Sequence, residues 1–429
     1  MTLFDLIYLP LACATAPWWM GKKRSGWSER FGRIESLPAP QAGRPRILLH
    51  GVSVGEVSAL RGVVPLLSPH FDVVVTATTD TGLARAHALF DNIASVRRFP
   101  LDLSWSVDQF LDSVRPNVVT LVELEVWPNF VARCHRRNIP VAVINGRLSA
   151  RSFRGYSRIR SIIAPSFRRL AVAAVQDDVY AERFRSLGVP PERIQITGSM
   201  KWDAAQIADH VTGADELAAK LGIDRSKPLV VAGSTGPLPA QGAPIGVDGR
   251  DGRPTWCEEA LLHASCPEGV QLLCAPRKPE RFEEAARAMP GCVRRSQPTN
   301  APPGNPASGR FLLDSIGELR AAYSLADVAI VGRSFGLLHG SDPIEPVALG
   351  KPTLIGPRYG DFEGSVGPLV ASGGLKEVSA AALRQNLEVL IGSPLLRSQM
   401  GEAGRECVRR EMGASQRHAA ILHSLLTPQ

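Results

Sequence analysis

The stretch RILLHGVSVGE at residues 46–56 decides the fold of this chain. It starts with the mostly apolar run RILLH, continues through small residues, and ends on an acid, Glu56, that begins a helical pattern. Such an apolar run suits a strand that is covered on both faces of a sheet. Strand, turn and helix together predict the first half of a βαβ unit, with the turn at the carboxyl edge of a parallel sheet.

The same alternation continues through the first half of the chain. Short β-branched runs are separated by segments with the length and periodicity of helices, which favours a parallel sheet built from βαβ units. The runs predicted as strands are 46–50, 72–78, 117–123, 140–146, 170–175 and 193–198. The segments predicted as helices are 56–68, 80–90, 127–137, 149–167 and 177–187.

After Lys201 a polar helical stretch interrupts the pattern, which then starts again. We therefore predict an α/β protein with two Rossmann-like domains, joined by a linker near 203–225. The second series of predicted strands is 228–234, 270–276, 310–313, 327–334 and 352–357. The expected boundaries are an N-terminal segment at 1–25, a first domain at 26–205 and a second domain at 206–429.

The composition is that of a folded protein. Of 429 residues, 44% are hydrophobic and 21% charged, so intrinsic disorder, collagen and a polytopic membrane protein are poor fits. Lys and Arg exceed Asp and Glu by 49 to 41, a net charge of +8. This excess favours anionic partners, namely nucleic acid, phosphorylated small molecules or an acidic membrane surface. The seven cysteines lack the spacing of a zinc site or a disulfide framework.

The first 20 residues have the most membrane-like character in the chain, and a cluster of basic residues follows them. Asp5, Pro10 and Pro17 weaken a helix that would span a bilayer. We interpret the segment as a short anchor, or as an interfacial segment with Trp18 and Trp19 at the level of the headgroups. A helix packed on its own domain is the remaining alternative.

Acidic residues follow two predicted strands at the carboxyl edge of the first sheet. Glu56, in HGVSVGE at 50–56, lies in the first turn of a helix, where the dipole favours an ionised carboxylate that can remove a proton from a hydroxyl. Glu123 and Glu125, in VELEVWPN at 122–129, lie on the same side of their strand. A plainer role, complementing a helix N-terminus, is open for Glu56 and favoured for Glu125.

Cationic residues follow in the same domain. Arg147, Arg151, Arg154 and Arg158 recur at intervals of 4, 3 and 4 residues, which makes one stripe on a helix. Because like charges at this spacing destabilise a bare helix, the stripe favours a bound anion, with a solvated face as the alternative. Lys201, in GSMKWD, would lie at the mouth of a cleft between the domains, where a cation can face a phosphate or carboxylate.

Three motifs of the second domain follow strands or begin helices, so they converge on the carboxyl edge of its sheet. They are APRKPERF at 275–282, DSIGEL at 314–319 and GRSFGLLHGSDPIEP at 332–346. Arg277 can bind a phosphate through its guanidinium fork, and the turn at 316–318 offers N–H groups at a helix start. Glu345 is placed to accept hydrogen bonds from ribose hydroxyls. Taken alone, each motif has a simpler interpretation as a cap or a turn.

In these motifs the sequence resembles the Kdo transferases of lipopolysaccharide synthesis. This family of two-domain GT-B glycosyltransferases moves 3-deoxy-D-manno-octulosonic acid (Kdo) from CMP-Kdo to a lipid A precursor. The similarity extends from about residue 45 to 425 and includes the family's hydrophobic N-terminus on the inner membrane, which residues 1–20 resemble. The motifs, in family order, are HGVSVGE, VELEVWPN, INGRLSARSFRGY, GSMKWD, APRKPERF, DSIGEL, SDPIEP and GPRYGDF.

The resemblance implies roles for individual residues. Glu56 would be the general base on the acceptor hydroxyl, and Glu123 and Lys201 would assist the transition state. The residues implied for binding CMP are Pro276, Arg277, Ile316, Gly317, Glu318, Asp342, Pro343, Ile344 and Glu345. The residues expected to bind the acceptor are Ser53, Gly55, Arg147, Arg151 and Arg154.

One motif departs from the family pattern. The family usually has GGHNPLEP where this chain has HGSDPIEP at 339–346, so that Ser341 and Asp342 replace a His and an Asn. An added negative charge beside a nucleotide phosphate is unfavourable unless it is neutralised or turned away. The departure therefore bears on the identity and affinity of the donor.

We therefore expect an inverting glycosyltransferase, with no metal and no cofactor, that moves Kdo from CMP-Kdo to the lipid A precursor lipid IVA. One alternative is a GT-B glycosyltransferase with another donor or acceptor, and another is a non-catalytic, membrane-associated protein that binds nucleotides or glycolipids. Besides donor and acceptor, the expected partner is an anionic membrane surface and not nucleic acid. The expected location is the cell inner membrane, through peripheral binding or a single N-terminal anchor, with cytoplasmic catalytic domains.

Overall fold

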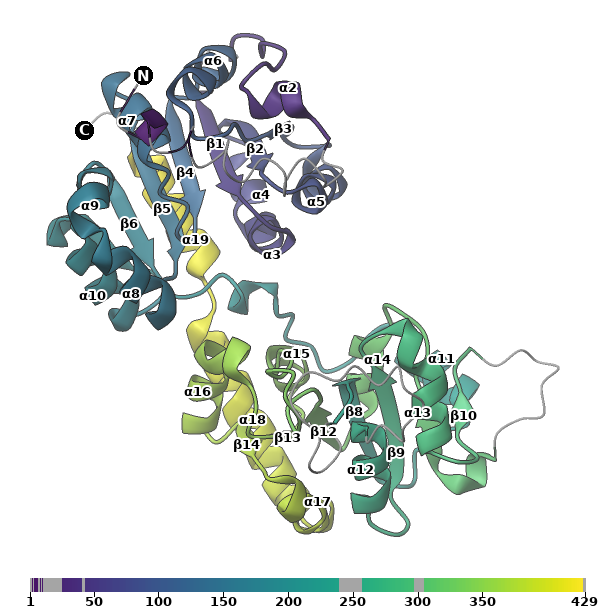
Figure 1. The fold of residues 1–429 in the computed structure, drawn as a ribbon. Helices are drawn as coiled ribbons and strands as arrows, with labels where there is room; N and C mark the ends of the chain where they lie inside the picture. The colour runs from purple at the N-terminus through teal and green to yellow at the C-terminus, as the bar shows by residue number, and fades with distance from the viewer. Residues whose placement is uncertain are drawn as a thin grey trace. The chain divides into compact units, whose positions relative to one another are not determined.

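The computed structural model describes residues 2, 4–6, 8, 10, 25–40, 43–238, 257–296 and 305–426. They divide into two compact units, each with its own β-sheet (Figure 1). The first unit comprises Met1–Ala204 and Glu411–Gln429, and the second comprises Ala205–Arg410. Two parallel-sheet α/β units confirm the predicted fold class.

The first unit contains a seven-stranded sheet with the order β3-β2-β1-β4-β5-β6-β7. All neighbouring strands are parallel. The strand order changes direction at β1. The chain first adds β2 and β3 on one side of β1 and then β4 to β7 on the other side. The strands are β1 (Arg46–Gly51), β2 (Asp72–Ala77), β3 (Ser95–Arg98), β4 (Val118–Val122), β5 (Val141–Gly146), β6 (Val172–Val175) and β7 (Ile194–Ile196).

Both faces of this sheet are covered, as the uninterrupted apolar runs predict. In β1 the side chain of Leu48 packs into one buried cluster, while those of Ile47 and Leu49 pack into another on the opposite face. The helices are α2 (Trp27–Arg30), α3 (Val54–Ala59), α4 (Val64–Leu67), α5 (Asp80–Phe90), α6 (Ser104–Val114), α7 (Pro128–Arg136), α8 (Ala150–Arg158), α9 (Arg160–Arg168), α10 (Asp178–Leu187) and α19 (Ala414–Ser424), with short 3-10 turns η1 (Leu60–Gly62), η2 (Pro191–Arg193) and η3 (Trp202–Ala204).

The second unit also has a seven-stranded parallel sheet, ordered β10-β11-β9-β8-β12-β13-β14. Its strands are β8 (Leu229–Thr235), β9 (Gln271–Pro276), β10 (Val293–Arg294), β11 (Arg310–Leu312), β12 (Val328–Val331), β13 (Thr353–Ile355) and β14 (Leu375–Glu377). Its helices are α11 (Ala214–Leu221), α12 (Glu258–Ser265), α13 (Phe282–Ala288), α14 (Leu319–Leu325), α15 (Ile344–Ala348), α16 (Glu363–Ala371), α17 (Leu383–Gly392) and α18 (Pro394–Glu411), with 3-10 turns η4 (Pro279–Arg281), η5 (Pro306–Ser308), η6 (Gly360–Phe362) and η7 (Ala380–Ala382).

The last helix, α19, corrects the predicted second domain, 206–429, because residues 411–429 belong to the first unit. In Figure 1 this helix runs alongside β5. Ala414 and Leu422 pack into the core of the first unit, and Asp203 accepts hydrogen bonds from the N–H groups of Gly413 and Ser415 at the start of the helix. The apolar pattern of a helix does not show which sheet the helix covers. The packing of α19 on the first sheet therefore could not be predicted from its local sequence.

Three strands were not predicted: β3, β10 and β14. Each is short, and all carry charged residues, as in SVRR for β3 and LKE for β14. They lie at or next to the sheet edges, where short polar strands are common. The helix predicted at 56–68 is instead divided into α3, η1 and α4.

Most of the N-terminal segment predicted at 1–25 lies outside the described residues. Its described part contacts the first unit, because Asp5 is fully buried. The Asp5 carboxylate accepts hydrogen bonds from the N–H of Ser104 at 2.8 Å and from the side-chain amide of Asn129 at 3.0 Å. Over the ranges that the structure describes, no helix is both long and apolar enough to cross a membrane.

Candidate functional site

The switch point of the first sheet lies between β1 and β4. Parallel α/β sheets bind ligands beyond the carboxyl ends of their strands at such a point. There, the connections that follow two neighbouring strands lead away in opposite directions. β1 and β4 are directly paired. Glu56 follows the end of β1, and Glu123 follows the end of β4. The fold therefore brings these two predicted catalytic residues to one place.

The Glu56 carboxylate is held by the turn that precedes it. Its Oε2 accepts the N–H of Val52 at 2.7 Å, and its Oε1 accepts the hydroxyl of Ser53 at 2.8 Å. Ser53 is the N-cap of α3, so the acid lies in the first turn of that helix, as predicted. The side chain is half-buried, and Gly55 beside it is exposed. The carboxylate is thus oriented and remains accessible to a ligand.

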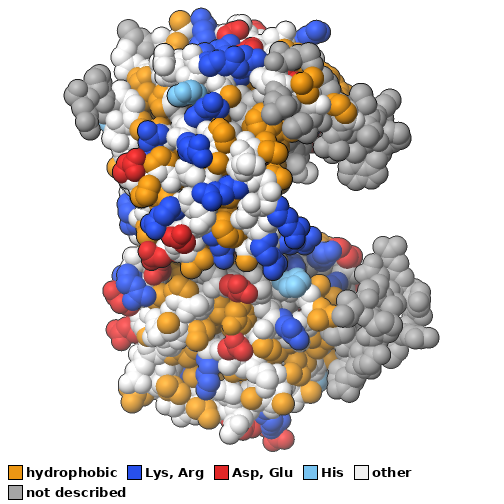
Figure 2. Space-filling view, turned by 60° about the vertical axis from the view of Figure 1, so that its left-hand side comes forward, with side chains coloured by type: hydrophobic (Ala, Val, Ile, Leu, Met, Phe, Trp, Pro, Cys, Tyr) orange, Lys and Arg blue, Asp and Glu red, His pale blue; other side chains and the backbone are white. Residues whose placement is uncertain are grey.

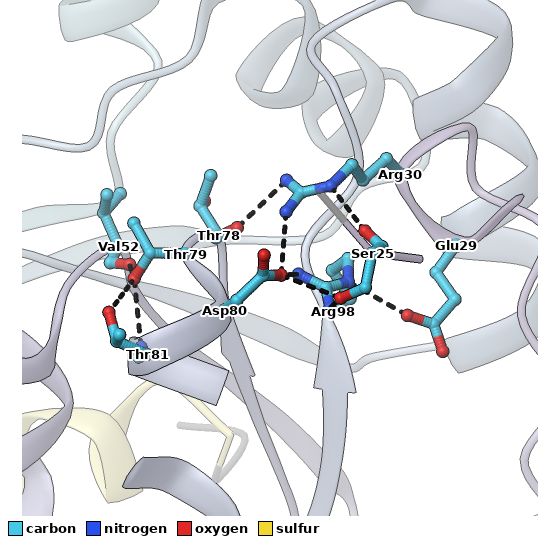
Figure 3. A network of polar contacts seen from close by, with 10 residues as sticks. Ser25, Glu29, Arg30, Val52, Thr78, Thr79, Asp80, Thr81 and Arg98 are labelled. Carbon is cyan, nitrogen blue, oxygen red and sulfur yellow. Dashed lines mark hydrogen bonds and ion pairs between the residues drawn. The ribbon is translucent and has the colours of Figure 1, made fainter. Parts of the chain in front are cut away.

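The loop that follows β2 supports this turn (Figure 3). The carbonyl oxygen of Val52 accepts hydrogen bonds from the N–H of Thr79 at 3.1 Å and from its hydroxyl at 3.0 Å. Next to Thr79, Arg30 and Arg98 both donate to Oδ1 of Asp80, at 3.2 and 2.7 Å. The two arginine side chains are 6% and 4% exposed. Although Asp80 itself is 42% exposed, its ion pairs with the two buried arginines fix the loop and, through Val52, the turn that carries Glu56.

Glu123 has an unusual backbone conformation, with a φ of 61°. A non-glycine residue in this left-handed region costs free energy and persists where its surroundings impose it, often at functional sites. Burial raises the pKa of the Glu123 carboxyl and the charge of Glu56 raises it further, while Arg147 and Lys201 act in the opposite direction. The structure therefore brings Glu56, Arg147 and Lys201 within electrostatic reach of Glu123.

Glu125 is a member of this group that we did not predict as a site residue. It precedes Trp127, the N-cap of α7, so it is not an acid of the first turn of that helix. Burial raises the pKa of its carboxyl to about 7, with further contributions from the charges of Glu56 and Glu123. The signal in the sequence was its spacing of two residues from Glu123, but the prediction that both acids lie on one side of their strand is wrong. β4 ends at Val122, so both acids lie in the turn that follows it.

Asn145 is a second unpredicted residue, and it positions the segment that carries Lys201. Its side-chain oxygen accepts the N–H of Met200 at 3.0 Å, and its own N–H donates to Nε2 of His418 at 3.2 Å. Burial lowers the pKa of the His418 imidazole to about 4, so the ring is neutral and can accept this bond. Asn145 also has a positive φ, 52°. The residue ties β5 to Lys201 and to α19.

The predicted acceptor residues Arg151 and Arg154 are exposed on α8, whereas Arg147 precedes the helix and is half-buried. Among the described residues, none of these three arginines forms an ion pair. The sequence has no Asp or Glu from 126 to 176, so nothing nearby along the chain neutralises the stripe. Figure 2 shows a face of the molecule on which Lys and Arg side chains lie among apolar ones.

The residues predicted to bind the donor lie at the carboxyl edge of the second sheet. Pro276 is the buried last residue of β9, and the next residue, Arg277, is exposed. Ile316 is 72% exposed, and Gly317 has a φ of 96°, which favours glycine. The carboxylate of Glu318 accepts hydrogen bonds from Ser315 and Arg295, and these contacts outweigh burial and lower its pKa.

Residues 342–345, which belong to the motif that differs from the family pattern, lie at the start of α15. The Asp342 carboxylate accepts the N–H of Ile344 at 3.0 Å, so at least one of its oxygens is turned toward the helix backbone. Pro343 is the N-cap, and both Pro343 and Ile344 are buried. Burial raises the pKa of the Glu345 carboxyl. The charge of Arg320 lowers this pKa, and the charge of Asp342 raises it further. Within the second unit these residues follow β12, as Arg277 follows β9.

The chain is similar in sequence to proteins of known name. The family described as 3-deoxy-D-manno-octulosonic-acid transferase (kdotransferase) matches residues 25–204. A 3-deoxy-D-manno-octulosonic acid transferase of Haemophilus influenzae is 34% identical over 94% of this chain and 92% of its own. The chain belongs to this transferase family. The transferase of Bordetella pertussis is 30% identical over 95% of each chain.

Solved structures agree with the fold expected for this transferase family. A glycosyltransferase from Rickettsia africae has a TM-score of 0.57 at 11% identity, covering 90% of this chain and 100% of that chain. Anabaena HepE in complex with UDP has a TM-score of 0.57 at 11% identity, covering 89% and 100%. At such identities the likeness concerns the fold, which is that of the GT-B glycosyltransferases. Because it belongs to the transferase family, the chain is a glycosyltransferase.

Proposed function

We propose that this protein transfers Kdo from CMP-Kdo to a hydroxyl of a lipid A precursor, lipid IVA, with inversion at the anomeric carbon. The observation that carries the proposal is the oriented, accessible Glu56 carboxylate at the switch point of the first sheet, beside Glu123, on which Arg147 and Lys201 also act. Membership of the Kdo transferase family supports the choice of sugar.

In this reaction Glu56 is the general base. Its carboxylate takes the proton of the acceptor hydroxyl while that oxygen attacks the anomeric carbon of Kdo. The bond between that carbon and the phosphate oxygen of CMP breaks, and CMP leaves with the electron pair. The hydrogen bonds from Val52 and Ser53 keep the carboxylate in the position of a base before the acceptor arrives.

The surrounding charges support this role. Glu123 and Glu125 lie close enough to Glu56 for its charge to raise the pKa of both carboxyls. Arg147 and Lys201 supply positive charge to the same group, where it can stabilise the anionic groups of donor and acceptor in the transition state. We assign Glu123 and Lys201 to the catalytic group on this basis.

The second unit is proposed to bind the CMP moiety. Arg277 follows β9 with its side chain exposed, so its guanidinium can bind the single phosphate of the donor. The N–H groups of Ile316, Gly317 and Glu318 lie at the start of α14. Because Asp342 bonds the backbone at Ile344, its negative charge is partly directed away from a ligand. In this arrangement the departure from the family motif remains compatible with a CMP donor.

The exposed arginines of α8 are proposed to bind the phosphorylated acceptor and the anionic membrane surface from which it comes. Ile159 and Ile162 follow on the same segment and are 45% and 43% exposed. Exposed apolar residues beside unneutralised arginines are typical of surfaces that lie at a membrane interface. We propose peripheral association with the cytoplasmic side of the inner membrane.

Mass spectrometry tests the proposed function. The protein is incubated with CMP-Kdo and a tetra-acylated lipid A precursor, and the lipid products are analysed. We expect a lipid whose mass has increased by one or more Kdo units, with release of CMP. A lipid that gains a sugar only from another nucleotide donor, or binding of both substrates without turnover, would contradict the proposal.

A further inference from the structure

The second unit also has a glutamate at its switch point, on a residue outside all the motifs discussed above. β8 and β12 are paired neighbours, and the sheet continues through β9 on one side and β13 on the other. Glu258 is the first residue of α12, and its side chain lies between the loops that follow β8 and β12. It is 0% exposed.

The Glu258 carboxylate binds both loops through their backbones. Its Oε2 accepts the N–H groups of Gly236, at 2.9 Å, and Arg333, at 2.6 Å, and its Oε1 accepts the N–H of Phe335 at 3.1 Å. The N–H of Glu258 donates in return to the carbonyl of Gly236 at 3.0 Å. One buried side chain therefore fixes the loop after β8 to the loop after β12.

The two loops need such support because they are tightly packed and strained. A Cβ at Gly332 would lie 2.7 Å from the Cα of Thr235, so only glycine fits between them. Ser234, next to the last residue of β8, and Arg333, in the loop after β12, have φ angles of 56° and 60°. Non-glycine residues in this region persist where other contacts impose the conformation, and the bonds of Glu258 to Gly236 and Arg333 supply such contacts.

These loops lead directly to the residues proposed to bind the donor. The N–H of Arg277 donates to the carbonyl of Thr235 at 3.1 Å, which joins Arg277 to the end of β8, directly before Gly236. The N–H of Gly340 donates to the carbonyl of Arg333 at 2.8 Å, two residues before Asp342. Glu258 itself is buried away from any ligand. Its influence on the donor must therefore pass through the backbone of these loops.

We propose that Glu258 is a positioning residue of the donor site. It holds the loops after β8 and β12 in the conformation in which Arg277 and residues 342–345 bind a CMP-linked sugar. This inference rests on the proposed function, because it assumes that the second unit binds CMP. The next residue, Glu259, is also fully buried, but its carboxylate binds Thr235 and Arg281 and not the loop after β12.

The test compares Glu258→Gln and Glu258→Ala with the wild-type chain. Calorimetry measures the Kd for CMP, and steady-state kinetics with CMP-Kdo separates the donor KM from kcat and from the acceptor KM. For Glu258→Ala we expect the CMP Kd and the donor KM to rise about tenfold, because three backbone N–H groups lose their acceptor. Glu258→Gln should lie between, since its amide has one accepting oxygen. In both variants kcat and the acceptor KM should stay within about twofold, because Glu258 touches neither reacting group.

Two further variants make the result specific. Glu388→Gln, in an exposed pair with Arg384 on α17, is the control and should leave all four constants unchanged. Ser234→Gly accommodates the positive φ without strain and, combined with Glu258→Gln, should restore part of the affinity for CMP. If Glu258→Ala does not fold, Glu258→Gln and the double variant decide the matter.

The outcomes separate this inference from the proposed function. Equal CMP Kd values in the wild type and in Glu258→Gln would overturn the positioning role, as would a fall in kcat with an unchanged donor KM. A wild-type chain that binds no CMP would instead contradict the proposed function itself.

Discussion

The two sheets each have a glutamate at the switch point, and these glutamates have opposite surroundings. Glu56 of the first unit is half-buried, and its oxygens accept one backbone N–H and one hydroxyl. Glu258 of the second unit is fully buried, and its oxygens accept three backbone N–H groups. An accessible carboxylate can take a proton from a ligand, whereas a buried one bound by three donors holds backbone in place. Position in the fold alone therefore does not assign the role.

The charges around the two residues differ in the same way. Glu123 and Glu125 lie near Glu56, and the charges of Arg147 and Lys201 act on Glu123. The hydrogen-bond partners of Glu258 are instead backbone groups. We expect changes in the first group to alter turnover with little change in stability. Changes at residues that hold backbone should alter stability or binding.

The largest effect among the neighbours of Glu56 is expected at Lys201. Lys201→Met removes a positive charge from the catalytic group, and kcat should fall about a hundredfold, as is usual when one stabilising group of a transition state is lost. The melting temperature should stay within about 2 °C, because Lys201 is only half-buried. Lys220→Met, in the last turn of α11, is the control. A Lys201→Met enzyme within threefold of wild type would show that this cation has no catalytic part.

Asn145 should behave as a residue whose side chain fixes the backbone of another segment, here at Met200. Asn145→Ala removes the acceptor for the N–H of Met200 and leaves alanine at a φ of 52°, so the free energy of unfolding should fall by about 2 kcal/mol. Asn145→Gly loses the same hydrogen bond without the backbone strain and should lose less. Urea unfolding measures both values. Equal losses in the two variants would show that the positive φ costs nothing here.

Particular residues show how far the sequence could predict this structure. The apolar runs of the central strands predicted both sheets, and the acids after β1 and β4 predicted the site, because burial on two faces and the carboxyl edge leave local patterns. The short charged strand β3 has no such pattern. Asn145 is hydrogen-bonded to His418, which lies 273 residues further along the chain. Glu258 binds the loop after β12, which is also distant from it in the sequence. These contacts depend on tertiary packing, which a local pattern does not contain.

Glu125 links the catalytic group to pH. Its folded-state pKa of about 7 lies above the ordinary 4.5, so the folded state binds the proton more tightly than the unfolded state. The resulting stabilisation is fully present below pH 4.5 and is lost as the pH rises through 7. Between pH 6 and 8 this group should lower the free energy of unfolding by about 1 kcal/mol.

The measurement for Glu125 is urea unfolding at pH 6 and pH 8, compared with Glu125→Gln. The variant has no proton to lose, so the difference between its two values should be smaller than in the wild type by the contribution of Glu125. Glu182→Gln, on the exposed surface of α10, should leave the wild-type difference unchanged. An identical pH dependence in Glu125→Gln and the wild type would show that Glu125 does not contribute to the pH dependence of stability.

The smallest effect is expected on α8. Arg154→Gln removes one exposed charge, worth about 1 kcal/mol near an anionic bilayer, so binding to vesicles rich in anionic phospholipid should weaken about fivefold. Sedimentation with vesicles at low and high salt measures this change, which should shrink as salt rises. Arg185→Gln on α10, where the arginine is paired with Glu182, should change binding less. Equal effects of the two variants would show that α8 has no special place at the membrane.

The most direct test of the central claim is the turnover of Glu56→Gln with CMP-Kdo and the lipid A precursor. The amide keeps the shape of the side chain and can still accept the N–H of Val52, but it cannot take up the proton. We expect transfer of Kdo to fall by several orders of magnitude, while the Kd for CMP and the melting temperature stay near the wild-type values. Near-normal turnover of Glu56→Gln would contradict this claim.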